Sequence, residues 1–148
     1  MSLTVDVSTE GERIALSRST VGDIARGVLR AERVREALIS ITFVSRARIA
    51  SINRKHLDHP GPTDVISFGF SRPSRRDPVM GDVYIAPAVA RRNAGVAGVS
   101  IREELVRLVV HGVLHVLGHD HPNGTSRTRS PMWRRQERLV ARLMPARS

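Results

Sequence analysis

The sequence of 148 residues contains no cysteine, and this absence excludes two classes of protein. Disulfide-stabilised secreted scaffolds need paired cysteines, and zinc fingers bind their metal through thiolates. Any metal ion must therefore be held by histidine, aspartate or glutamate. No apolar run approaches the roughly 18 residues of a membrane-spanning helix, and the N-terminus lacks the basic and apolar regions of a signal peptide. We expect a cytoplasmic protein that does not enter a membrane.

Lysine and aromatic residues are also scarce. Lys55 is the single lysine among 24 basic residues, and only 14 acidic residues oppose them, which gives a formal net charge of +10. Because the planar guanidinium of arginine suits phosphate, the expected partner is a polyanion, although codon usage and solvated helix faces are an alternative source of the arginines. Aromatic residues make up 3% of the chain, which argues against a base-stacking platform and favours phosphate contacts.

The hydrophobic content of 41% and the length fit one domain over residues 1–148 with one buried core. Alternating or β-branched apolar residues predict strands, and apolar residues at helical spacing predict helices. The predicted strands are residues 3–7, 38–45, 63–70 and 81–86. The predicted helices are residues 17–33, 46–55, 87 to about 95–98, a helix that starts near Ser100, and 132–144.

Four of the six histidines lie within residues 111–121, in the pattern H-x-x-x-H-x-x-G-x-x-H. His111 and His115 are one helical turn apart on the same face, so two imidazoles can share a cation. Gly118 can end the helix in a left-handed conformation and turn the chain back, which delivers His121 toward the same point. We expect one zinc ion on these three histidines, with a fourth position open for water.

The same pattern occurs in metzincin metalloproteases, with one difference. Gly112 stands where those enzymes carry the glutamate that acts as general base, so a metallopeptidase is the least favoured function. A capping box formed by Ser100 and Glu103 starts the histidine helix. That helix is apolar nearly all round, which predicts a buried central helix carrying the histidine pair. The alternative is that His111 and His115 are ordinary core or surface histidines.

Four segments of the chain resemble the YbeY family of rRNA-maturation endoribonucleases and follow one another in the family's order. They are residues 40–45 running on to Asn53, residues 62–68, residues 81–85 and the histidine segment. The resemblance implies a mixed α+β fold with a four-stranded sheet flanked by helices, zinc on the three histidines, and cleavage of single-stranded RNA. It also implies partnership with the small ribosomal subunit in 16S rRNA 3′-end maturation and quality control.

Two positions depart from the family's pattern. An arginine that is functional in many members corresponds to Leu57 here, and Arg54 lies one helical turn away from it. His119 stands where many members have tyrosine, and it is a competing candidate for the third metal ligand. We nevertheless expect His121 to be the ligand, because it has the three-residue reach after Gly118 that the pattern uses.

These residues suggest a hydrolytic mechanism in which zinc-bound water is the nucleophile. We expect Arg54 to neutralise the phosphate and His119 to meet the phosphate or transfer a proton. Asp120 is the first candidate to orient a ligand imidazole, and Asp64 and Asp82 are the other two. Each of these aspartates has the alternative role of a helix cap or turn residue.

Residues 71–78 predict an exposed basic loop between two strands, and its Arg72, Arg75 and Arg76 are candidates for RNA binding. A merely solvated turn is the alternative for this loop. The expected nucleic acid is RNA rather than DNA. A non-catalytic ribosome-assembly factor, in which zinc stabilises the fold and arginines supply the affinity, is the main rival to the enzyme.

Overall fold

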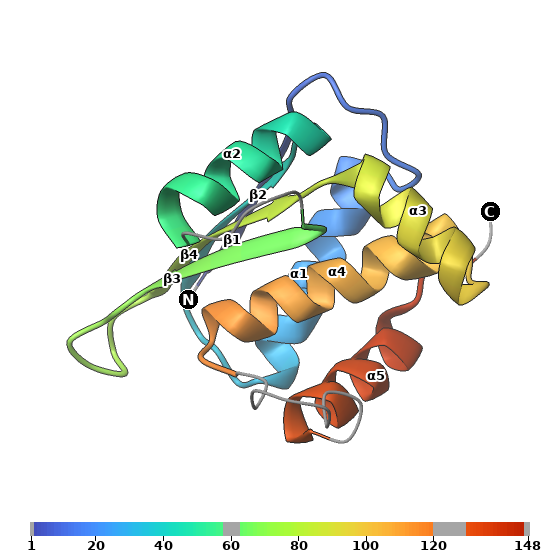
Figure 1. Cartoon of the computed structure of the whole chain (residues 1–148). Coiled ribbons are helices and arrows are strands. Elements are labelled where there is room, and N and C mark those ends of the chain that lie inside the picture. The colour runs from blue at the N-terminus through green and yellow to red at the C-terminus, as the bar shows by residue number, and fades with distance from the viewer. Residues whose placement is uncertain (1, 58–62, 120–129, 147–148) are drawn as a thin grey trace.

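The computed structural model describes residues 2–57, 63–119 and 130–146, and it confirms the α+β architecture (Figure 1). The strands are β1 (Leu3–Thr9), β2 (Ala37–Phe43), β3 (Val65–Phe70) and β4 (Val79–Ile85). The helices are α1 (Arg18–Ala31), α2 (Arg46–Leu57), α3 (Pro87–Ala97), α4 (Ile101–Val116) and α5 (Pro131–Leu143). All nine correspond to segments predicted from the sequence, with ends that differ by a few residues.

The four strands form one mixed sheet in the order β1-β2-β4-β3. β1 pairs with β2 and β2 pairs with β4 in parallel, whereas β3 runs antiparallel to β4. The predicted four-stranded mixed sheet is therefore confirmed. β1 and β3 are the two edge strands, which agrees with the half-buried alternation of residues 3–7.

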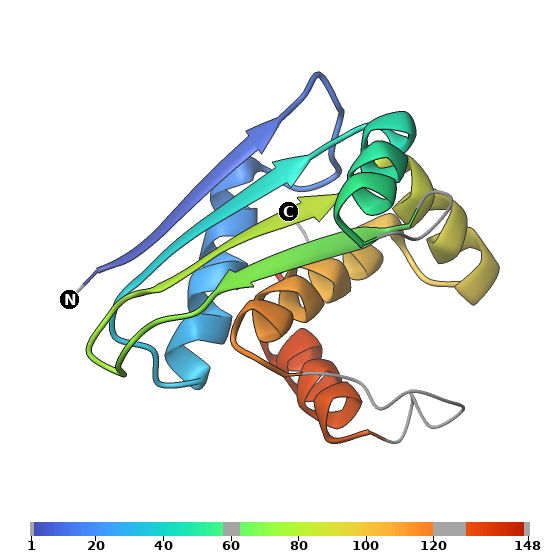
Figure 2. The same cartoon turned by 60° about the vertical axis from the view of Figure 1, so that its left-hand side comes forward.

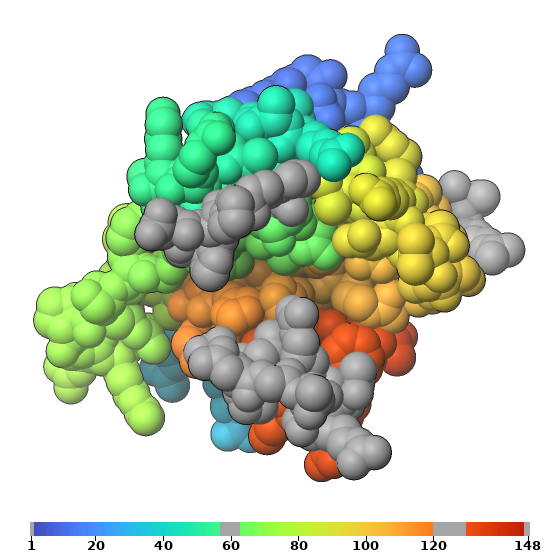
Figure 3. Space-filling model, in the orientation of Figure 1, coloured from blue at the N-terminus to red at the C-terminus, as the bar shows by residue number. Residues whose placement is uncertain are grey.

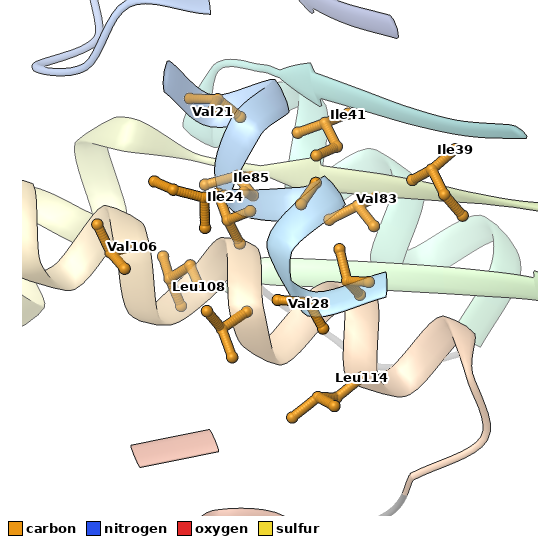
Figure 4. Packing of buried hydrophobic residues seen from close by; sticks show 14 of the residues in the cluster. Val21, Ile24, Val28, Ile39, Ile41, Val83, Ile85, Val106, Leu108 and Leu114 are labelled. Atoms are coloured by element: carbon orange, nitrogen blue, oxygen red, sulfur yellow. The ribbon is translucent and has the colours of Figure 1, made fainter. Parts of the chain in front are cut away.

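Side chains alternate across the sheet and divide the core into two layers. The larger layer lies between the sheet and α1 and α4, where Ile39, Ile41 and Val83 pack against Val28 and Leu114 (Figure 4). A smaller layer lies on the other face, beneath α2 (Figure 2). α5 packs on α4 rather than on the sheet. The histidine helix is therefore enclosed between the sheet and α5.

α4 begins and ends where the sequence predicts. The side chain of Ser100 accepts a hydrogen bond from the backbone N–H of Glu103 at 3.1 Å, and Glu103 and Glu104 complement the positive end of the helix dipole. Gly118 has φ of 97°, and the N–H of His119 then donates to the carbonyl of Leu114 at 3.0 Å. Ten of the sixteen residues of α4 are buried, which confirms the predicted central helix.

The end of α4 that carries the histidines approaches the sheet closely. A Cβ atom at Gly81 of β4 would lie 2.5 Å from a methyl group of Val116 and 2.7 Å from the carbonyl oxygen of Phe68. Only glycine permits this approach, so the sequence of β4 fixes the height of the helix above the sheet. Within the described ranges, no helix combines the length and hydrophobicity needed to cross a membrane.

Candidate metal centre

The histidine pair lies on the last two turns of α4. The rings of His111 and His115 stand edge to face, with centroids 4.6 Å apart and planes inclined by 65°. Both side chains are half-buried. The helical spacing therefore brings two imidazoles together at the surface of the core, as the sequence predicts.

Gln136 of α5 determines which nitrogen of His111 carries the proton. This glutamine is 2% exposed, and its Oε1 lies 2.7 Å from Nδ1 of His111. Its Nε2 donates to Oε2 of Glu137 at 3.1 Å, which fixes the orientation of the amide. Because an amide oxygen only accepts, Nδ1 of His111 must be protonated, and Nε2 of the neutral ring carries the lone pair. A lone pair on Nε2 is what a metal ion requires, so the described part of the site fits a metal.

A salt bridge anchors the glutamine in turn. Arg107 of α4 donates to both carboxylate oxygens of Glu137 at 2.9 Å, and to Glu103 at 3.1 Å. Burial raises the pKa of Glu137, but the hydrogen bonds from Arg107 and Gln136 outweigh it and hold the pKa below 4.5. The hydrogen bond to Glu137 likewise raises the pKa of Arg107. A charged pair therefore stabilises the chain of contacts from Arg107 to His111.

His119 has a different partner. Its Nε2 lies 2.6 Å from Oε1 of Glu32, the residue that caps the C-terminal end of α1. Arg135 of α5 donates to the other oxygen of Glu32 at 2.9 and 2.6 Å. Burial raises the pKa of Glu32, but these hydrogen bonds lower it below 4.5 overall. His119 is thus tied to the end of α1, and its predicted role in proton transfer stays a prediction.

Close packing at position 112 explains why glycine stands there in place of the glutamate that metalloproteases use as general base. A Cβ at this position would lie 2.6 Å from Cγ1 of Val83 and 3.3 Å from Oγ of Ser67, which itself donates to the carbonyl of Gly112 at 3.0 Å. Position 112 therefore faces β3 and β4. A glutamate there would enter the core rather than approach a substrate, so the structure argues against the metallopeptidase function.

Two of the three aspartates proposed to orient a ligand imidazole have other partners in the structure. Asp82 accepts a hydrogen bond from Ser40 at 2.6 Å, and Asp64 accepts one from Asn93 at 3.3 Å. Gln136, rather than an aspartate, is the acceptor that orients the ring of His111.

Three other predicted site residues are not brought to the histidine pair by what the structure describes. His121 and Asp120 lie outside the described residues. Among residues 2–57, 63–119 and 130–146, no three histidine or acidic side chains gather around a common point. Arg54 is exposed on α2, which covers the opposite face of the sheet from α4. To contact a phosphate bound at His111 and His115, the side chain of Arg54 would have to extend past the edge strand β3.

The basic loop at residues 71–78 is exposed, as predicted, and stands out from the surface (Figure 3). Ser74 and Asp77 shape it: the N–H of Ser74 donates to Oδ2 of Asp77 at 3.0 Å, and the N–H of Asp77 donates to the carbonyl of Ser74 at 3.1 Å. The exposed Arg72, Arg75 and Arg76 are therefore presented on a defined turn.

Similarity to known proteins identifies the family of this chain. The family model described as Endoribonuclease YbeY matches residues 6–144. The chain belongs to the endoribonuclease YbeY family. A relative from Acidothermus cellulolyticus named Endoribonuclease YbeY is 39% identical over 131 residues, covering 80% of this chain and 79% of its own. Another of that name, from Pelotomaculum thermopropionicum, is 36% identical over 146 residues, covering 93% and 95%.

The fold of this YbeY-family chain also has a solved counterpart. The solution structure of a Thermotoga maritima protein aligns with a TM-score of 0.64 at 20% sequence identity, covering 95% of this chain and 89% of that one. At 20% identity, this similarity is evidence of a shared fold alone. It confirms the arrangement of a mixed sheet with helices on both faces.

The residues that support the histidine pair were not predicted from the sequence. Gln136 occupies a polar position on the otherwise apolar face of α5, which also carries the buried Leu139 and Val140. A polar side chain on a buried helix face is a signal that a hydrogen-bond partner lies opposite. The partner itself is 25 residues away in sequence, so no local pattern identifies it.

Proposed function

We propose that residues 1–148 act as one metal-dependent endoribonuclease domain that cleaves single-stranded RNA. The proposed metal is one zinc ion per chain, held by His111, His115 and His121. The observation that carries the proposal is the hydrogen bond from His111 to Gln136, because a buried acceptor on one imidazole nitrogen is the usual support of a metal-binding histidine. The names of the relatives, all Endoribonuclease YbeY, supply the class of reaction.

Zinc, when bound, is a Lewis acid that stabilises charge on a phosphoryl oxygen and lowers the pKa of water. The protein's own residues hold the metal ion and orient its ligands and the RNA phosphate. Gln136 keeps the proton on Nδ1 of His111. In this proposal Arg54 neutralises the phosphate around the edge of the sheet, His119 transfers a proton, and Asp120 orients a ligand imidazole. Arg72, Arg75 and Arg76 contact RNA phosphates away from the reacting bond.

The proposed biological substrate is the 3′ end of 16S rRNA on the small ribosomal subunit, in the cytoplasm, with a further role in ribosome quality control. The sequence resemblance described above supports this assignment, and so does the net charge of +10, which favours association with a particle rich in phosphate.

The deciding experiment compares zinc-loaded wild-type protein with His115→Ala on single-stranded and duplex RNA. We expect wild-type protein to cut the single-stranded RNA and His115→Ala to be inactive, with circular dichroism and ribosome binding unchanged. Cleavage by neither protein, together with intact ribosome binding, would favour the non-catalytic assembly factor. The observation that favours this second function is the exposed arginine loop at residues 71–78.

A further inference from the structure

The connection from α1 to β2 lies beside the loop from β3 to β4 (Figure 2). Residues of these two segments line a groove that is rich in arginine. Its volume is about 990 Å³. The arginines that line it are Arg33, Arg35, Arg72, Arg75 and Arg76. A neighbouring hollow of about 570 Å³ shares Arg33 and Arg35 and adds Arg26 and Arg30. Arg72, Arg75 and Arg76 of the loop therefore form one wall of a larger, positively charged surface that includes the groove and the neighbouring hollow.

The carboxylates in the groove leave most of this charge uncompensated. Glu32, Glu36 and Asp77 also line it. Glu32 already accepts hydrogen bonds from Arg135 and His119, and Asp77 accepts one from the backbone of its own loop. In the part of the chain that the structure describes, none of the five groove arginines has a carboxylate oxygen within 4.0 Å. All five side chains are exposed, so an incoming anion can approach them. Arg72 also donates to the backbone carbonyl of Asp77 at 3.0 Å, which holds its guanidinium group at the groove.

The backbone of Arg33 gives an independent indication that its side chain has a function. α1 ends in a Schellman motif, in which the N–H of Val34 donates to the carbonyl of Leu29 at 2.9 Å and that of Arg33 donates to Arg30 at 3.0 Å. This motif places Arg33 at φ of 60°, and among the described residues no other non-glycine has a positive φ. Glycine normally occupies this position because a Cβ is disfavoured there. An arginine kept at a strained position suggests that the groove needs its charge.

We propose that this groove binds the sugar-phosphate backbone of single-stranded RNA that extends away from the histidine segment. The inference rests on the proposed function, which supplies RNA as the ligand. Glu32 connects the two regions, since it lines the groove and accepts the hydrogen bond from His119. The described residues that line the groove include no aromatic side chain, so binding occurs through phosphates and is independent of base sequence. The strongest effect of salt on RNA affinity should therefore map to these arginines.

The test measures binding of a fluorescein-labelled single-stranded RNA by anisotropy, in EDTA so that cleavage does not interfere. Arg33→Gly combined with Arg35→Ala removes two groove charges. Arg91→Ala combined with Arg92→Ala removes two charges from α3, on the other side of the molecule (Figure 1), and is the matched control. With a salt slope of about 0.7 per phosphate contact on single strands, we expect the groove variant to lose about 1.4 from the slope and roughly 10- to 30-fold in affinity at 0.1 M salt. The control should lose less than threefold.

The single substitution Arg33→Gly separates binding from folding. Glycine adopts a positive φ without strain, so the melting temperature of the Arg33→Gly variant should equal or exceed that of wild-type protein, while its RNA affinity falls. A lower melting temperature would overturn the strain argument. The opposite wall is tested by Arg75→Ala with Arg76→Ala, which should lower affinity as the first pair does.

Two results would overturn the proposal that the groove binds RNA. One is unchanged RNA affinity in both groove variants, and the other is an equal loss in the α3 control, which would assign binding to overall charge. Failure of the proposed function is seen separately, because wild-type protein would then bind RNA in an arginine-dependent way but cut no RNA when loaded with zinc.

Discussion

The contact between Gln136 and His111 allows a sharp test of the candidate metal centre. Replacing Gln136 with leucine keeps the side-chain size but removes the acceptor that lies 2.7 Å from Nδ1. Because Gln136 is only 2% exposed, the ring N–H is left without this partner in a place that water reaches poorly. Loss of such an outer partner typically weakens metal binding by about 10- to 100-fold, or roughly 1.4–2.7 kcal/mol. We expect zinc affinity to fall by that amount.

Competition with a chromophoric chelator measures the zinc affinity, and nitrogen chemical shifts of His111 report its tautomer in metal-free protein. The wild-type ring should carry its proton on Nδ1. The loss of this hydrogen bond in Gln136→Leu should also cost the metal-free fold about 1–3 kcal/mol, which corresponds to a decrease of roughly 3–10 °C in melting temperature.

Two further variants control for this loss of stability. Leu139→Ala removes a buried side chain of the same helix and should destabilise the fold by about 2–5 kcal/mol without changing zinc affinity. Gln136→Glu keeps an acceptor for Nδ1 and should bind zinc at least as tightly as wild-type protein, although the buried carboxylate beside Glu137 lowers the melting temperature. If Gln136→Leu binds zinc within twofold of wild-type protein, the argument for an oriented metal ligand fails.

Three other predictions concern neighbouring residues. His121→Ala should lose zinc, measured by elemental analysis, whereas His119→Ala should keep zinc and show reduced RNA cleavage; the reverse stoichiometry would assign the third ligand to His119. The folded-state pKa values of Glu32 and Glu137 lie below 4.5, so their stabilisation is complete above about pH 4.5 and is lost as the pH falls through the lowered values. Thermal melts between pH 7 and 3 should show this loss, and Glu32→Gln should reduce its size. Gly112→Ala should destabilise the fold by about 1–3 kcal/mol in urea titration, because the added methyl group would lie 2.6 Å from a core side chain; an unchanged midpoint would contradict the packing of α4 on the sheet.

Local sequence patterns predicted the elements well because their signals are local. The capping box at Ser100, the left-handed Gly118 and the helical spacing of His111 and His115 are all readable within a few residues. The ends of strands were less accurate. The strand predicted to start at Gly81 starts at Val79, whose N–H donates to the carbonyl of Glu36, a contact between segments far apart in the chain.

The supporting residues of the site could not be predicted for the same physical reason. Gln136 meets His111 because α5 packs on α4, and Glu32 meets His119 across 87 positions of sequence. Neither contact leaves a periodic or spaced signal. The groove is a comparable case, since the sequence identified Arg72, Arg75 and Arg76 but gave no indication that the end of α1 forms the opposite wall.

The position of Gln136 in α5 has a consequence for the newly made protein. Synthesis proceeds from the N-terminus, so α4 and its histidines leave the ribosome before the glutamine that orients His111. Until α5 docks, the imidazole of His111 lacks this acceptor, and metal held at the pair would be held more loosely. Formation of the candidate metal centre is therefore coupled to the docking of α5 on α4. If zinc binds as proposed, full activity would therefore require that α5 has been made and has docked on α4.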